Sequence, residues 1–286
     1  MSSPVPRPEH GAAAGAVAGG AVLLGAVLPA ARPVPGASGT SGAAPGGTAL
    51  AAVEKFDDDF TGEPDARLFP AEAAVLTRAV DKRRREFTTG RICAHRALEA
   101  LGVPAIPILP GEHREPRWPA GVVGSITHTA GYRAAAVARV TAGRPVSVGI
   151  DAEPNEATPG GVLREISLPE ERELLTELAR AHPEVSWDRL LFSAKESVYK
   201  AWFPLARRWL GFDDARLTLT VDEDTTGATA GHGVTGHGAA LVARGAFQAR
   251  LLVPGPRLPA GELTGFTGRW AVGRGLIVTA IAFGCG

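Results

Sequence analysis

The sequence predicts an α+β (mixed α/β) protein built from two halves, each with a few strands and one main helix. In the first half, an amphipathic helical pattern covers residues 70–101 and is followed by two strand patterns. In the second half, a strand pattern at residues 146–152 precedes a helical pattern at residues 186–204. Further strand patterns follow. The order of these patterns predicts the two-part architecture.

The composition is that of a globular protein without a bulk charge. The chain has 286 residues, of which 45% are hydrophobic and 21% charged, and its formal net charge is zero. A zero net charge argues against a protein that binds nucleic acid through a basic excess. The two cysteines, Cys93 and Cys285, have neither metal-ligand nor disulfide-framework spacing, which favours a reduced, cytoplasmic protein.

Residues 1–47 differ from the rest, because Ala, Gly, Pro and Ser dominate them and charges are few. Such a segment buries too little apolar surface to offset the loss of conformational entropy, so a disordered leader is expected. Residues 12–31 are also compatible with a weak secretory signal. The Ala and Gly content and the mixed charges of Arg7 and Glu9 argue against export, and the glycines argue against a membrane span.

The first half is expected to begin near residue 48, with a helix over residues 70–101. Pro70 suits a helix start, Gly102 suits a stop, and Gly90 is a candidate break. A seven-residue repeat predicts the buried side of this helix, and its members are Val80, Phe87, Ala94 and Leu101.

The other elements follow from apolar alternation and from helix-starting residues. Strands are expected at residues 122–127, 132–140, 146–152, 216–221, 247–253 and 276–283. Pro169 is expected to start a helix to residue 181, and Ser186 to cap the helix that ends at Pro204. Residues 222–238 are expected to form an exposed loop. Its histidines, His232 and His237, lack the further ligands that a zinc site needs.

Asp151 and Glu153 are candidate metal ligands at the end of a predicted strand. Positions two apart in a strand face the same way, so the two carboxylates are expected side by side. Adjacent carboxylates repel each other unless a cation lies between them, and hard oxygen ligands suit magnesium. The alternative is a strand that runs into a solvated turn with both acids merely exposed.

Glu196 and Lys200 lie one turn apart on the predicted helix 186–204. The simple interpretation is a surface ion pair worth roughly 0.3 kcal/mol. The helix is apolar on several sides, however, and so is expected to be buried. A Glu–Lys pair on a buried helix indicates the border of a site.

Two further features are typical of phosphate binding. Residues 124–129 join small residues and hydroxyls to His128 at a strand end, where a turn can bind phosphate. The second feature is a basic run at residues 82–85 together with Arg91. Arg83, Arg84 and Arg91 are expected on the less exposed side of their helix, and a solvated helix face is the alternative.

Taken together, these features resemble the 4'-phosphopantetheinyl transferases of the surfactin and enterobactin synthetase type, and most closely the enterobactin-like branch. The matching stretches are residues 84–98, 115–138, 147–154 and 190–202, in the expected order. The resemblance covers about residues 48–219, and it implies a monomeric, pseudo-twofold pair of α/β halves. The implied halves are residues 48–145 and 146–286.

The resemblance also implies roles for individual residues. Asp151, Glu153 and Glu196 match the acidic metal positions, and Lys200 matches the lysine that assists the leaving group. Coenzyme A phosphates are implied to contact Thr127, His128 and a basic residue of the loop 110–117, for which we take Arg114. Arg83 or Arg84, together with Arg91, is implied to hold the 3'-phosphate, and the register within residues 83–85 stays open. His113 and Arg117 remain alternatives to Arg114.

The implied reaction is Mg²⁺-dependent. It moves phosphopantetheine from coenzyme A to a serine of an acyl or peptidyl carrier protein and releases 3',5'-ADP. Carriers of polyketide, non-ribosomal peptide, siderophore or fatty-acid synthesis all remain open. Glu196, directly or through a metal-bound water, is the expected base. Two alternatives stay open: another magnesium-dependent phosphotransfer or phosphohydrolase enzyme, and a non-catalytic carrier-binding homologue.

Overall fold

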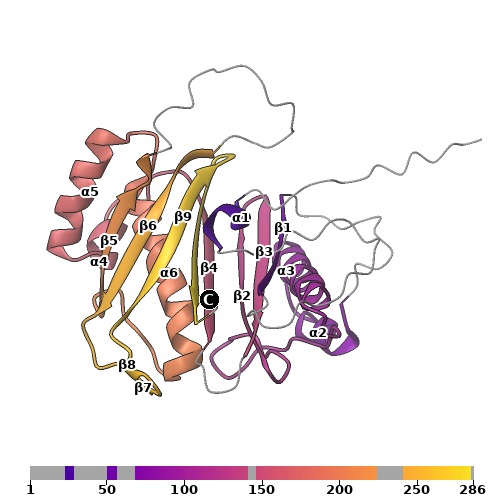
Figure 1. Ribbon diagram of the computed structural model, residues 1–286. Helices are drawn as coiled ribbons and strands as arrows, with labels where there is room; N and C mark the ends of the chain where they lie inside the picture. The colour runs from indigo at the N-terminus through magenta and orange to yellow at the C-terminus, as the bar shows by residue number, and fades with distance from the viewer. Residues whose placement is uncertain (1–22, 29–49, 57–67, 141–145, 224–240, 285–286) are drawn as a thin grey trace, which may run out of the picture.

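The computed structural model describes residues 23–28, 50–56, 68–140, 146–223 and 241–284, and it shows the predicted mixed α/β fold (Figure 1). The earlier part of the chain forms a three-stranded antiparallel sheet in the order β1-β3-β2. Its strands are β1 (Leu50–Lys55), β2 (Val122–Thr129) and β3 (Tyr132–Arg139). One face of this sheet is covered by α3 (Asp81–Ala100), which α2 (Pro70–Val75) precedes.

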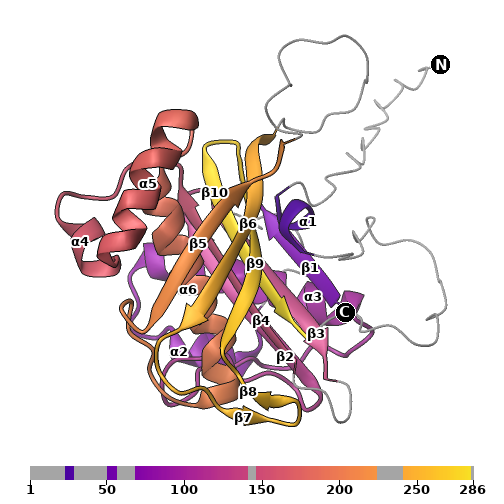
Figure 2. The ribbon, with the colours of Figure 1, turned by 60° about the vertical axis from the view of Figure 1, so that its left-hand side comes forward.

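The later part forms a five-stranded antiparallel sheet in the order β4-β10-β9-β6-β5. Its strands are β4 (Ser147–Pro154), β5 (Ala215–Val221), β6 (Leu241–Leu251), β9 (Gly265–Gly273) and β10 (Leu276–Phe283). Helix α6 (Trp187–Ala206) packs on one face. Figure 2 shows the smaller helices at the β5 side of this sheet: α4 (Val162–Ile166) and α5 (Pro169–Ala181). Strands β7 (Arg257–Leu258) and β8 (Gly261–Glu262) form a short hairpin.

The two sheets meet where β2 lies beside β4 (Figure 1). Two side-chain hydroxyls of β2 accept hydrogen bonds from backbone N–H groups of β4. Ser125 Oγ accepts from Ile150 at 3.1 Å, and Thr127 Oγ1 accepts from Ala152 at 3.0 Å. In both bonds the residue of β4 lies 25 positions after the residue of β2. Because this offset stays constant along the strands, the two strands run in the same direction. We call this contact the hydroxyl seam.

Apolar side chains fill three regions of the structure. Trp202, Phe247 and Trp270 lie between α6 and the five-stranded sheet, and a smaller cluster lies between α3 and the three-stranded sheet. A third cluster joins the other faces of both sheets, with Ile150 and Ala152 of β4 among its members. The alternation of β4 is as predicted: its even-numbered side chains enter this third cluster, and Ser147 and Asp151 contact α6 on the other face.

The third cluster contains a segment of the expected leader. Helix α1 (Leu24–Val27) contacts β1 of one sheet and β9 and β10 of the other. Leu23, Leu24, Val27 and Leu28 are at most 4% exposed. The N–H groups of Leu23 and Leu24 donate to the carboxylate of Glu54, which also accepts from the Tyr132 hydroxyl at 2.7 Å. The prediction of a disordered leader is therefore wrong for residues 23–28, where local apolar content outweighs the Ala- and Gly-rich average.

The predicted helix 70–101 is interrupted, but at residues 76–80 and not at Gly90. Arg84 stabilises this turn, since it donates from Nε to the Ala79 carbonyl at 2.9 Å and from Nη2 to the Thr77 carbonyl at 3.2 Å. Val80 is 72% exposed, so it does not belong to the buried stripe. Gly90 lies inside α3, where a Cβ would approach Ile126 to 3.3 Å.

Most other predicted elements occur with shifted ends, and β1 and β9 were not predicted. The bulk of the predicted loop 222–238, with His232 and His237, lies outside the described residues. In the part of the chain that the structure describes, no helix combines the length and hydrophobicity needed to cross a membrane.

Removal of residues 1–45 is expected to destabilise the protein, contrary to what a disordered leader implies. Leu23, Leu24, Val27 and Leu28 bury their side chains against both sheets, and without them that apolar surface would be exposed to water. We therefore expect a lower melting temperature. A chain that begins at residue 20 keeps α1 and serves as the control. Equal melting temperatures for the two shortened chains and the full chain would contradict this role of α1.

Candidate active site

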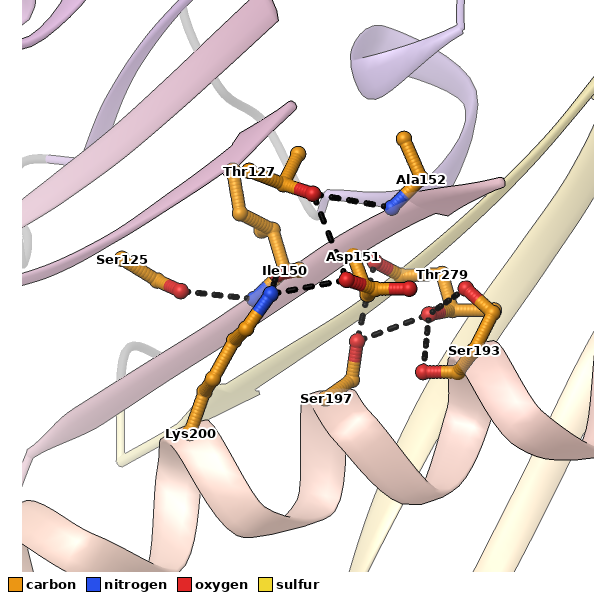
Figure 3. Close-up of polar contacts among 9 residues, drawn as sticks. All are labelled: Ser125, Thr127, Ile150, Asp151, Ala152, Ser193, Ser197, Lys200 and Thr279. Carbon is orange, nitrogen blue, oxygen red and sulfur yellow. Dashed lines mark hydrogen bonds and ion pairs between the residues drawn. The ribbon is translucent and has the colours of Figure 1, made fainter. Parts of the chain in front are cut away.

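The candidate site lies where β4, β2 and α6 meet (Figure 3). Asp151 and Glu153 project from β4, and Glu196 and Lys200 project from α6. Asp151 is 6% exposed, while the other three side chains are half-buried. The structure therefore brings together the four residues that the sequence assigned to metal binding and leaving-group stabilisation.

Helix α6 reaches β4 because there is no side chain between them at Gly149. A Cβ at this position would overlap the Ser197 carbonyl oxygen and lie 2.8 Å from the Ala201 nitrogen. Nearby, Ser147 Oγ donates to the Ala201 carbonyl at 2.6 Å. Small residues along α6 permit this approach, which fixes the helix that carries Glu196 and Lys200.

Buried hydroxyls tie α6 to β10 behind Asp151 (Figure 3). Thr279 Oγ1 lies 2.7 Å from Ser197 Oγ and 3.0 Å from Ser193 Oγ. In the β4–β10 ladder, Thr279 is the partner of Asp151. The three hydroxyls of Thr279, Ser193 and Ser197 therefore connect the strand position of Asp151 to the helix that faces it.

The Asp151 carboxylate is held by one of its two oxygens. Lys200 Nζ donates to Oδ1 at 2.7 Å, and Thr127 Oγ1 donates to the same oxygen at 3.3 Å. The other oxygen, Oδ2, is buried and has no hydrogen-bond partner within the described residues. A buried carboxylate oxygen without a partner is costly unless a cation binds it. This oxygen is the strongest indication of a metal position.

Burial and mutual repulsion raise the pKa values of the other two acids. Desolvation is the main cause for both Glu153 and Glu196, and the negative charge of Asp151 adds to it. Lys200 opposes the shift at both residues. Glu153 also accepts from Arg189 Nη1 at 3.1 Å. Among the described residues, no three acidic, His or Cys side chains are grouped as a ready metal site. A metal would therefore compete with Lys200 and Arg189 for the acids.

A basic margin borders the acids on the side of β2. Burial lowers the pKa of His128, the nearby Glu86 opposes this, and the charges of Arg133, Arg83 and Lys200 lower it further. The same Arg83 charge acts on Arg91. Arg83, Arg133 and Lys200 thus place positive charge near His128, and a positive region favours a bound anion. Contacts of His128 and Arg83 with phosphate stay a prediction.

The other predicted phosphate ligands are placed less favourably. Arg83 and Arg84 are exposed, contrary to the predicted side of the helix, and Arg84 is bound to the turn before α3. Arg91 is 8% exposed, donates from Nε to the Ile108 carbonyl at 2.7 Å, and has a pKa lowered to about 10 by burial. Arg114 lies in an exposed loop with a φ of 67°. Thr127 is 2% exposed, and its hydroxyl is already committed to Asp151 and Ala152.

A pocket of about 300 Å³ opens beside Glu196. Its walls include Tyr199 and Trp209, whose ring centroids lie 4.9 Å apart, and also His113. His113, not Arg114, is thus the residue of loop 110–117 that the structure brings beside Glu196. The sequence analysis did not identify this pocket.

The sequence also did not predict the contacts of Arg189 or of the buried hydroxyls of Ser193 and Ser197 on α6. The small residues Ser193, Ala194, Ser197 and Ala201 recur at helical spacing, which was the available signal for a close helix–strand contact. Arg189 follows a predicted helix start, and its sequence position carries no comparable signal.

Comparison with known proteins shows the family of the chain. Residues 71–138 match the family described as 4'-phosphopantetheinyl transferase N-terminal domain, and residues 147–242 match the 4'-phosphopantetheinyl transferase superfamily. The 4'-phosphopantetheinyl transferase Svp of Streptomyces mobaraensis is 52% identical over 232 residues, 81% of this chain and 85% of that protein. The chain belongs to the 4'-phosphopantetheinyl transferase superfamily.

Two further relatives of this transferase are known. The 4'-phosphopantetheinyl transferase PptT of Mycobacterium tuberculosis is 48% identical over 233 residues, 81% of this chain and 91% of that protein. Enterobactin synthase component D of Salmonella typhi is 38% identical over 166 residues, 58% of this chain and 67% of that protein. The resemblance and the enzyme class that the sequence predicted are confirmed.

Replacement of Gly149 by Ala is expected to disable this transferase. The added methyl group would push α6 away from β4, and a displacement of about 1 Å at a catalytic group can lower a rate roughly a hundredfold. Gly160→Ala is the matched control, since a Cβ there meets nothing within 4 Å. Transfer rates and melting temperatures of both variants check this. A Gly149→Ala enzyme that transfers within twofold of wild type would contradict the close-contact argument.

Proposed function

We propose that the protein transfers the 4'-phosphopantetheine arm of coenzyme A to a serine of an acyl or peptidyl carrier protein and releases 3',5'-ADP. The buried, unpartnered Oδ2 of Asp151, beside two acids of raised pKa and one lysine, carries this proposal. Family membership supports it.

The donor set fits a magnesium ion. Asp151, Glu153 and Glu196 offer only hard carboxylate oxygens, and Oδ2 of Asp151 has no competing donor among the described residues. We assign these three acids to the metal. When bound, magnesium neutralises charge that develops on the pyrophosphate of coenzyme A. Ala152 lies between the two acids of β4 and offers no side-chain ligand.

Glu196 is the proposed base. Its pKa is raised by burial and by the charge of Asp151, with Lys200 opposing. A carboxylate with a raised pKa accepts a proton more readily near neutral pH. Glu196 also borders the pocket, so a carrier serine placed there would have its hydroxyl within reach.

Besides its ion pair with Asp151, Lys200 is proposed to stabilise the leaving group. In the protein alone, its ammonium group is held by Asp151 Oδ1 and by the Ile150 carbonyl at 3.1 Å. Its side chain is 26% exposed, so the ammonium group is accessible from the site. A fixed cation of this kind stabilises the negative charge on the departing 3',5'-ADP.

Arg83 and His128 are proposed to hold the 3'-phosphate, with Arg91 behind them. The partner is a folded carrier domain of polyketide, non-ribosomal peptide, siderophore or fatty-acid synthesis. Enterobactin synthase component D carries a siderophore synthase name, which supports the siderophore possibility. We propose that the enzyme acts as a monomer in the cytoplasm.

Replacing Glu196 by Gln is expected to lower carrier modification by roughly a hundredfold or more, the range for loss of a general base. The amide keeps the size of the side chain but cannot accept the proton. Exposed Glu177 on α5 provides the control Glu177→Gln. The mass of an apo-carrier incubated with coenzyme A and magnesium measures the transfer. If Glu196→Gln keeps more than a tenth of the wild-type rate, the assignment of the base is wrong.

The basic margin predicts a cofactor-dependent penalty for Arg83→Ala. An arginine–phosphate contact contributes about 1.5–3 kcal/mol, and partial exposure points to the lower end, so kcat/KM for coenzyme A should fall roughly tenfold. With 3'-dephospho-coenzyme A, which lacks the phosphate, the penalty should largely vanish. Arg84→Ala is the neighbouring control. Equal penalties with both cofactors would show that Arg83 does not contact the 3'-phosphate and is only a residue of an exposed helix face.

A further inference from the structure

Thr127 joins the two halves of the protein at the candidate metal position. It belongs to β2, whereas Asp151 and Ala152 belong to β4. Its hydroxyl accepts from the Ala152 N–H at 3.0 Å and donates to Asp151 Oδ1 at 3.3 Å (Figure 3). The side chain is 2% exposed. One buried hydroxyl therefore serves both the hydroxyl seam and the acid.

This arrangement determines which oxygen of Asp151 is available. A carboxylate can rotate about its last bond, so either oxygen could face a cation. Thr127 of β2 and Lys200 of α6 both donate to Oδ1. Oδ2 is left buried without a partner in the described part of the chain. Because both donors bind Oδ1, they select the rotation of the Asp151 carboxylate that leaves Oδ2 without a donor.

We propose that Thr127 is a positioning residue, whose hydroxyl orients Asp151 so that Oδ2 is presented to the metal. The inference rests on the proposed function, because it takes Asp151 as a metal ligand. It replaces direct phosphate binding as the task of the Thr127 hydroxyl. It also makes the alignment of the two sheets a condition for metal binding, since the same hydroxyl bonds across the seam.

Ser125 provides a matched comparison on the same strand. It lies two residues before Thr127, is 3% exposed, and accepts the Ile150 N–H at 3.1 Å in the same way. Its hydroxyl makes the seam contact and, among the described residues, has no hydrogen bond to Asp151. A variant of Ser125 therefore loses a seam bond alone, whereas a variant of Thr127 loses a seam bond and the orientation of the acid.

The test measures Mn²⁺ binding to the full-length protein by electron paramagnetic resonance, together with melting temperature. Thr127→Val keeps the branched shape but removes the hydroxyl, and it should weaken Mn²⁺ binding roughly tenfold, as loss of a group that orients a metal ligand does. Ser125→Ala should lower the melting temperature similarly while leaving Mn²⁺ affinity within about twofold of wild type. Thr127→Ser restores the hydroxyl and should restore the affinity. Thr127→Ala replaces the valine variant if that variant does not fold.

The outcomes separate this inference from the proposed function. If wild-type protein binds no Mn²⁺, with or without coenzyme A, the proposed metal site itself fails. If wild type binds and Thr127→Val binds equally well, only the positioning role fails. A raised KM for coenzyme A with unchanged Mn²⁺ affinity would also overturn it, because that result indicates direct phosphate contact. Weakening in Thr127→Ser as large as in Thr127→Val would also contradict the proposal, because the hydroxyl would then not be sufficient to restore the affinity.

Discussion

Helix α6 lies against strand β4 with no side chain between their backbones at Gly149, and this contact places the residues of the candidate site. The distance between a strand and a covering helix is normally set by the side chains between them. Here glycine on the strand and small residues on the helix remove that spacing. Short side chains such as Asp151 can then reach groups on the helix, as the 2.7 Å contact with Lys200 shows. Serine and threonine hydroxyls satisfy the polar groups that this close packing buries.

The electrostatics of the site follow from the same packing. Acids from β4 and α6 are forced together in a partly dehydrated region, and Lys200 and Arg189 offset part of the repulsion. His128 of β2, and Arg83, whose positive charge acts on it, lie on the other side. A ligand that carries phosphates and brings a divalent cation complements both regions at once. The protein is neutral overall, so this polarity is local and comes from the arrangement of a few side chains.

The sequence placed the three acids and the lysine on their strand and helix, because these positions depend on local geometry alone, whereas their roles come from the family resemblance and stay a prediction. Asp151 and Glu153 follow from strand alternation, and Glu196 and Lys200 from helical spacing. Partners from distant segments were not predictable in this way. Arg84 and Arg91 were assigned to phosphate from their charge, yet both donate to backbone carbonyls that a sequence pattern does not reveal. Composition likewise concealed residues 23–28, because an average over 47 residues hides the four of them that are buried.

The position of α1 has a consequence for the order of folding during synthesis. This helix is made early, but it contacts β9 and β10 near the other end of the chain. A ribosome releases the chain from its N-terminus, so α1 has no complete binding surface until almost the whole protein has emerged. Until then the Glu54 carboxylate lacks two of its donors and the apolar faces of both sheets remain open to water or to chaperones. Docking of α1 is thus a late event in folding, and it covers the apolar faces of both sheets.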